Sequence, residues 1–100
     1  MVAIYARTGT HDTEAIQRQI SKCIYDVKDG DLIIFSDCGV SDLSVNKPRL
    51  NLLIEKAKYG ELKKVIVADH SHFSRKPQEV ANIVSQLHET GVEVVFVEGK

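Results

Sequence analysis

The sequence predicts one α/β domain with three layers, in which a central, mostly parallel sheet of four or five strands carries helices on both faces. Four short apolar runs, at residues 2–6, 31–35, 64–68 and 92–97, have the length and composition of strands. Three stretches with helical periodicity separate them, so strands and helices alternate along the chain. This alternation is typical of βαβ units, whose crossovers place consecutive strands parallel. The 100 residues contain no internal repeat or linker, which predicts a single domain over residues 1–100.

Each helical stretch has an apolar stripe and end signals. We expect Asp12 as the N-cap of the first helix, and Pro48 and Pro77 in the first turns of the second and third. Gly60 and Gly91 are expected just past the ends of the second and third helices. The residues expected to face the core are Ile16, Ile20, Cys23, Ile24 and Val27, then Leu50, Leu53, Ile54 and Ala57, then Val80, Ile83, Val84 and Leu87.

Composition limits the partners that the domain can bind alone. The net charge is −1 and the sequence pI is about 6.4. A domain that binds DNA unaided is normally basic, because its affinity comes largely from Lys and Arg at the phosphates. Any DNA contact is therefore expected to be local or to depend on another segment or partner.

The cysteines and the terminal sequence indicate a cytoplasmic protein. Cys23 and Cys38 have no metal-binding or redox spacing, so we expect two reduced thiols. The chain enters its first strand directly, without a signal peptide, and no apolar run has membrane-spanning length.

Three segments that follow strands bring charged and hydroxyl side chains to one edge of the sheet. They span residues 7–10, 37–47 and 69–75, and the carboxyl ends of parallel strands share the edge where open α/β sheets bind ligands. The middle segment lies in a long loop, residues 36–47, of the kind that often carries function. Arginine suits a phosphodiester because its planar fork bonds two oxygens. The titratable residues that we single out there are Arg7, Asp37, Lys47, Asp69, His70, His72 and Arg75.

Motifs in these three segments resemble those of the serine recombinases, the resolvase/invertase family. Residues 5–10 read Tyr-Ala-Arg-Thr-Gly-Thr, where the family reads Tyr-Ala-Arg-x-Ser-Thr. Residues 37–42 read Asp-Cys-Gly-Val-Ser-Asp, followed by Lys47-Pro48, where the family reads Asp-x-Gly-x-Ser-Gly and Arg-Pro. Residues 68–75 read Ala-Asp-His-Ser-His-Phe-Ser-Arg, similar to Lys-Asp-Leu-Ser-Arg-Phe-Gly-Arg of the large-recombinase and transposon branch. The resemblance covers nearly the whole chain.

The resemblance implies a resolvase-like (flavodoxin-like) fold and the cleavage and rejoining of DNA strands without a cofactor. In the family a serine attacks a backbone phosphate to form a 5′-phosphoserine link, and arginines stabilise the developing charge. The implied catalytic residues are Arg7, Asp37 and Arg75, with Arg7 and Arg75 approaching each other beside Asp37 and with Gly9 at the position of the nucleophile. The residues implied to contact DNA phosphate are Arg7, Thr8, Thr10, Gln19, Ser41, Lys47, Ser71, His72 and Arg75.

Several positions depart from the family pattern. Gly9 has no side chain and cannot form a covalent intermediate. His72 replaces a permanent bidentate cation with a titratable ring, Lys47 keeps a charge without the fork, and Asp42 adds an anion. Changes at several positions of one site indicate natural decay of catalysis. A hydroxyl from Thr8 or Thr10 would lie ångströms away from the position of the family's serine hydroxyl, and a displacement of that size greatly lowers the rate of attack on phosphorus.

The resemblance also implies partners. In the family the catalytic domain continues into a long dimerisation helix and a DNA-binding region, whereas this sequence stops at Lys100. We therefore expect DNA binding through segments outside these residues, and either a homo-oligomer or pairing with an active recombinase. No membrane partner is expected.

Two other classes of function stay open at the level of sequence. A degenerate domain could act as a non-enzymatic regulatory or interaction module of a mobile element, because a fold does not dictate a function. A metal-dependent phosphohydrolase could use Asp69, His70 and His72, with Asp37 and His11 nearby. The two histidines would present their rings alike only if the strand persisted through that segment, and no second cluster of ligands follows, so no metal is assigned.

Overall fold

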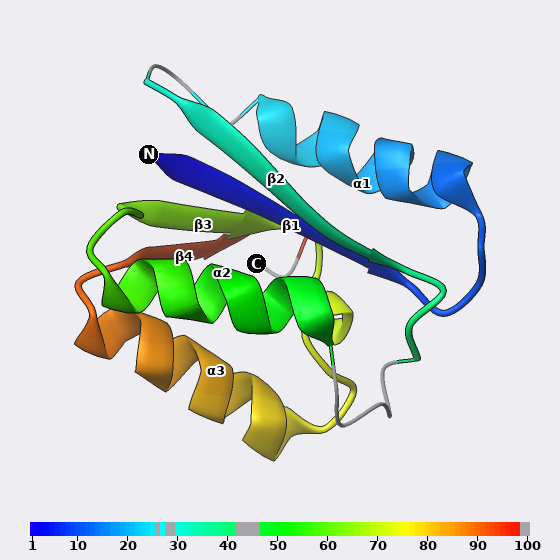
Figure 1. Ribbon diagram of the computed structural model, residues 1–100. Helices are drawn as coiled ribbons and strands as arrows, with labels where there is room; N and C mark the ends of the chain where they lie inside the picture. The colour runs from blue at the N-terminus through cyan, green and yellow to red at the C-terminus, as the bar shows by residue number, and fades with distance from the viewer. Residues whose placement is uncertain (26, 28–29, 42–46, 99–100) are drawn as a thin grey trace.

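The computed structural model describes residues 1–25, 27, 30–41 and 47–98, and it has the three predicted layers (Figure 1). The strands β1 (Val2–Thr8), β2 (Leu32–Cys38), β3 (Lys64–Val67) and β4 (Glu93–Phe96) form a parallel sheet in the order β2-β1-β3-β4. The helix α1 (Thr13–Ile24) covers one face, whereas α2 (Pro48–Lys58) and α3 (Pro77–Glu89) cover the other. The predicted α/β fold is confirmed.

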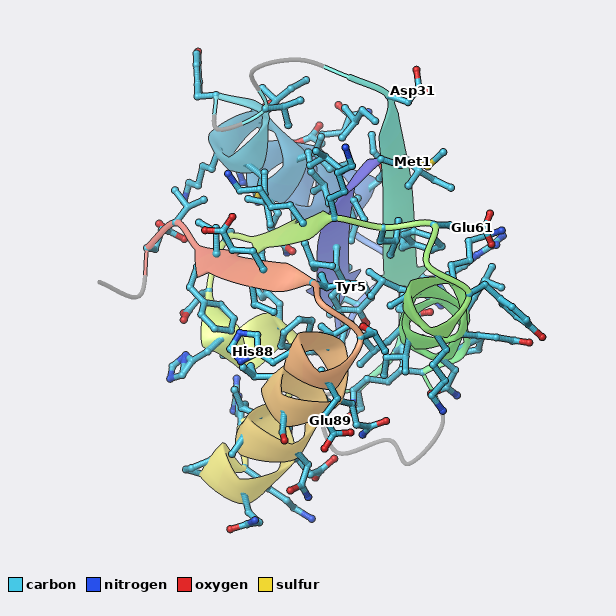
Figure 2. All side chains as sticks on the ribbon, turned by 90° about the vertical axis from the view of Figure 1, so that its left-hand side faces the viewer. Met1, Tyr5, Asp31, Glu61, His88 and Glu89 are labelled. Atoms are coloured by element: carbon cyan, nitrogen blue, oxygen red, sulfur yellow. The ribbon has the colours of Figure 1, made fainter. Side chains whose placement is uncertain are left out.

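The core has two halves because strand side chains alternate between the faces of the sheet. Ala3 and Tyr5 of β1 pack with α2 and α3, whereas Ile4 packs with Cys23 of α1. Residues 3–7 of β1 are all buried, as expected for a central strand of a parallel sheet with both faces covered. Figure 2 shows Tyr5 in the interior.

Local signals predicted the start of each helix and the ends of α2 and α3 correctly, whereas α1 ends at Ile24, before Val27 of its predicted stripe. The Asp12 carboxylate caps α1 by accepting hydrogen bonds from the backbone N–H groups of Glu14 and Ala15. Gly60 and Gly91 follow α2 and α3 with φ angles of 77° and 82°, a backbone conformation that favours glycine.

Ile24 was wrongly predicted to face the core, since its side chain is 46% exposed. At about 100° per residue, Ile24 lies roughly 80° around the helix from Ile16, at the margin of the apolar stripe. Cys23 lies within about 20° of Ile16 and is fully buried. The stripe on α1 is therefore narrower than the pattern indicated.

Two strands also extend further than predicted. β1 continues through Arg7 and Thr8, and β2 continues through Ser36, Asp37 and Cys38, with Arg7 paired to Asp37 and Thr8 to Cys38 in the register. The loop predicted over residues 36–47 therefore begins at Gly39, and its residues 42–46, including Asp42, lie outside the described part of the chain. Asp37 is thus a strand residue.

The strand order places a topological switch point between β1 and β3. The chain crosses from β1 to β2 on one side and then returns to add β3 and β4 on the other. In such sheets ligands bind beyond the carboxyl ends of the strands at this point. Figure 2 looks onto the opposite, amino ends, where Met1, Asp31 and Glu61 lie. Within the described residues, the helices are too short or too polar to cross a membrane.

Candidate phosphate site at the carboxyl ends of the strands

Arg7 joins the three segments that follow the strands. Its guanidinium group is buried, with the residue only 7% exposed. Nε donates to the carbonyl of His72, Nη2 to the carbonyl of Ser71 and Nη1 to the carbonyl of Val40, each at 2.9 Å. The side chain thus ties the end of β1 to the segments after β2 and β3. Three of the five N–H donors of an arginine are used in this way.

Gln19 reaches from α1 to the main chain of the same residue. Its Oε1 accepts a hydrogen bond from the Arg7 N–H at 3.0 Å, and its Nε2 donates to the Arg7 carbonyl at 2.8 Å. The structure therefore brings Arg7, Gln19, Ser71 and His72 together. The contacts with DNA phosphate that the resemblance implies for these four residues stay predictions.

Asp37 holds the start of α2. Its carboxylate accepts hydrogen bonds from the backbone N–H groups of Arg49 and Leu50, at 3.0 and 3.1 Å, and from the hydroxyl of Tyr5 at 2.8 Å. The N-cap residue Lys47 makes no capping bond with its own side chain, so Asp37 supplies the cap from a neighbouring strand. Burial, together with this hydrogen bond, raises the pKa of Tyr5 far above its ordinary value. The catalytic role implied for Asp37 stays a prediction.

The segment around Gly9 has the shape of an open loop. The hydroxyls of Thr8 and Thr10 lie 3.4 Å apart, and Cys38 Sγ lies 3.7 Å from the Thr10 carbonyl. Apart from its chain neighbours, a Cβ atom placed on Gly9 would meet no atom of the described residues within 4 Å, and Gly9 does not have a positive φ. The backbone at Gly9 can therefore carry a side chain without strain.

Gly39 contrasts with Gly9 on the facing segment. It has a φ of 76°, and a Cβ atom there would lie 2.5 Å from the ring of His11. The positive φ therefore favours glycine at position 39, where the close neighbour is the ring of an exposed side chain, whereas position 9 has no positive φ.

The segment after β3 forms a 3₁₀ turn, η1 (His70–His72), in place of an extended strand. The condition for a paired His-x-His metal site is therefore not met, and the described residues contain no group of three His, Cys, Asp or Glu side chains that could hold a metal. Asp69 instead bonds within the turn, to His70 Nδ1 at 2.7 Å and to the hydroxyl of Ser71 at 3.2 Å.

The remaining predicted residues differ in exposure. Lys47 is only 4% exposed, whereas Ser41 and Arg75 lie at the surface. The predicted approach of Arg75 to Arg7 and the phosphate contacts of Thr8, Thr10, Ser41, Lys47 and Arg75 stay predictions. Sequence reasoning missed the part of Tyr5 in holding Asp37, although Tyr5 opens the first motif.

The ring of His72 is half-buried near charged groups of α1 and of the chain after β4. Its Nδ1 atom is buried and has no hydrogen-bond partner among the residues that the structure describes. Burial lowers the pKa of His72 below its ordinary value of 6.5; the charges of Arg7 and Lys22 act in the same direction, and those of Asp69 and Glu98 oppose it.

This environment predicts a loss of stability in acid. The folded protein keeps His72 neutral where the unfolded chain binds a proton, so stability is expected to fall as the pH drops from about 6.5 towards the lower folded-state pKa. Urea unfolding between about pH 7.5 and about pH 5 should show a weaker pH dependence for His72→Gln than for the wild type. His88→Gln, at an exposed position, is the control and should keep the wild-type dependence. Equal pH dependence in all three proteins would contradict the assignment to His72.

Comparison with known proteins agrees with the fold. The fold defines a parallel α/β domain. The family described as "Resolvase, N terminal domain" matches residues 2–100. The chain therefore belongs to this family.

Relatives extend the comparison. The chain is 32% identical over 104 residues to a Bacillus subtilis protein named "Putative DNA recombinase"; this match covers the whole chain and 21% of that protein. The chain thus spans about a fifth of the length of this curated relative.

Solved structures share the fold. The catalytic domain of TP901-1 integrase has a TM-score of 0.86 and 20% identity, with 96% of this chain and 76% of that chain covered. The first ORF in transposon ISC1904 of Sulfolobus solfataricus has a TM-score of 0.83 and 21% identity, with 99% and 68% covered. A resolvase family site-specific recombinase of Streptococcus pneumoniae has a TM-score of 0.78 and 25% identity, with 97% and 71% covered.

Proposed function

We propose that this chain is the catalytic-domain homologue of a site-specific serine recombinase whose covalent chemistry is lost because Gly9 occupies the position of the nucleophile. The family membership and the resolvase-like fold support the first part. The loss of covalent chemistry is inferred from Gly9, because a phosphoserine link requires a hydroxyl at that position.

The neighbouring hydroxyls are poor replacements. Thr8 is the last residue of β1, and its main chain is held there because its carbonyl accepts a hydrogen bond from the Val40 N–H at 2.9 Å. Thr10 lies one residue beyond Gly9, so its hydroxyl leaves the backbone from a different point. Ångström errors in the approach of a nucleophile cost orders of magnitude in rate.

The substrate of the proposed site is the DNA backbone, reached together with other segments or partners. The net charge of −1 gives little general attraction to DNA. DNA binding would then come from a DNA-binding region of the kind found in the family, and from a second copy or an active recombinase. We place the protein in the cytoplasm because its proposed substrate is DNA.

A fusion protein tests this proposal. Residues 1–100 are joined to the dimerisation and DNA-binding segments of an active relative and incubated with a supercoiled plasmid that carries two target sites. We expect no covalent protein–DNA adduct and no recombinant product. The unmodified relative, assayed in parallel, shows that the plasmid and segments are functional. An adduct from the unaltered chain would overturn the inactive assignment and point to Thr8 or Thr10.

A further inference from the structure

The end of β1 extends beyond its neighbour β3. The pairing of β1 with β3 stops at Tyr5 and Val67, whereas the pairing with β2 continues to Thr8 and Cys38. In a parallel ladder, alternate residues direct their N–H and C=O groups towards opposite neighbours. The Thr8 carbonyl bonds to Val40 on the side of β2, so the backbone of Arg7 faces the side where β3 has ended.

Gln19 occupies that vacant position. Its side-chain amide accepts from the Arg7 N–H and donates to the Arg7 carbonyl, which is the pair of bonds that a neighbouring strand would have made. Arg7 is buried, and leaving these two backbone groups without partners would be costly.

We propose that Gln19 is a positioning residue that replaces the missing strand partner of β1 and fixes the point from which the Gly9 loop departs. Both functional groups of its amide are engaged with the backbone of Arg7, two residues before Gly9. The guanidinium of Arg7 holds the same residue to the segments after β2 and β3. The role of the Gly9 loop in the recombinase site rests on the proposed function. The two hydrogen bonds between the Gln19 amide and the Arg7 backbone, called the Gln19 clamp below, do not depend on it.

The variant Gln19→Glu gives a test that depends on pH. A carboxylate can accept from the Arg7 N–H but repels the Arg7 carbonyl, whereas a protonated carboxyl donates and accepts as the amide does. The folded state should therefore raise the pKa of the introduced carboxyl. Both hydrogen bonds from side chain 19 to the Arg7 backbone are then present at low pH, and one of them is lost as the pH rises through that folded-state pKa.

Amide hydrogen exchange of the chain itself gives the measurement. Near neutral pH, the protection factor of the Arg7 amide should fall by about tenfold or more in Gln19→Glu and in Gln19→Leu. Towards about pH 4, protection should recover in Gln19→Glu and stay low in Gln19→Leu. Gln17→Glu, at an exposed position of the same helix, is the matched control and should resemble the wild type throughout.

Two results would overturn the proposal. Unchanged Arg7 protection in Gln19→Leu would show that the amide is not the partner of the strand end. Equal protection of Gln19→Glu and Gln19→Leu at low pH would show that Gln19 acts only by filling space. Neither result depends on DNA cleavage, so failure of this proposal is distinct from failure of the recombinase assignment.

Discussion

Replacing Gly9 by serine is expected to convert the inactive fusion protein into one that forms a covalent adduct with DNA. The substitution restores the family's Tyr-Ala-Arg-x-Ser-Thr motif, with the hydroxyl two residues after Arg7. A nucleophile that acts as a unit with its neighbours contributes on the order of a millionfold to the rate, so its return should dominate all other changes. The supercoiled two-site plasmid assay should show the adduct as DNA-linked protein.

The structure indicates that the serine can be accommodated. In the described part of the chain, no atom beyond its chain neighbours lies within 4 Å of a Cβ atom on Gly9, and the backbone there does not have a positive φ. Gly9→Ser should therefore leave the unfolding midpoint close to that of the wild type. Adduct formation then reports on chemistry rather than on folding.

Gly9→Ala is the matched control, because it adds the Cβ atom without the hydroxyl. It should fold like Gly9→Ser and form no adduct. His72→Arg added to Gly9→Ser tests whether the missing cation also limits the reaction. The proposal of lost catalysis on an intact scaffold would be contradicted if neither the single nor the double variant formed an adduct.

Removing the carboxylate of Asp37 is expected to destabilise the domain by about 3 kcal/mol, the largest effect on stability that we predict. Asp37→Ala leaves the hydroxyl of Tyr5 and two N–H groups in the first turn of α2 without their acceptor. Tyr5→Phe removes only one of these three bonds and should cost about 1 kcal/mol. Urea unfolding followed by circular dichroism measures both changes.

Two further variants make this result specific. Asp37→Asn keeps one acceptor oxygen and should lie between the wild type and Asp37→Ala. Asp31→Ala, at an exposed position just before β2, should leave stability unchanged within about 0.5 kcal/mol. If Asp37 served only catalysis, Asp37→Ala would be about as stable as the wild type. That result would contradict this prediction.

Local signals explain why most of the fold could be predicted from the sequence. Apolar runs and periodic stripes depend on neighbouring residues, as do the cap at Asp12 and the glycine stops at Gly60 and Gly91. Strand ends depend on pairing instead. Polar residues such as Arg7 and Asp37 gave no signal for strand, yet the parallel register carries both strands through them.

The contacts within the site depend on residues far apart in the sequence, and this is why sequence could place the residues but not their bonds. Arg7 meets the carbonyls of Ser71 and His72 across more than 60 positions, and those bonds accompany the 3₁₀ turn that follows β3. The roles in catalysis and phosphate binding that the resemblance implies for Asp37 and Gln19 stay predictions. Their bonds to the backbone became visible only in three dimensions.

The open space around Gly9 has a consequence for how such a domain loses its activity over generations. An exchange between serine and glycine at this position is expected to leave folding, and hence cellular abundance, unaffected, because the described residues impose no packing or backbone requirement there. Loss of Arg7 or Asp37 would instead lower the amount of folded protein. Once selection for DNA cleavage is relaxed, mutation is therefore expected to erase the reactive hydroxyl first, while quality control against misfolding continues to retain the buried residues around it.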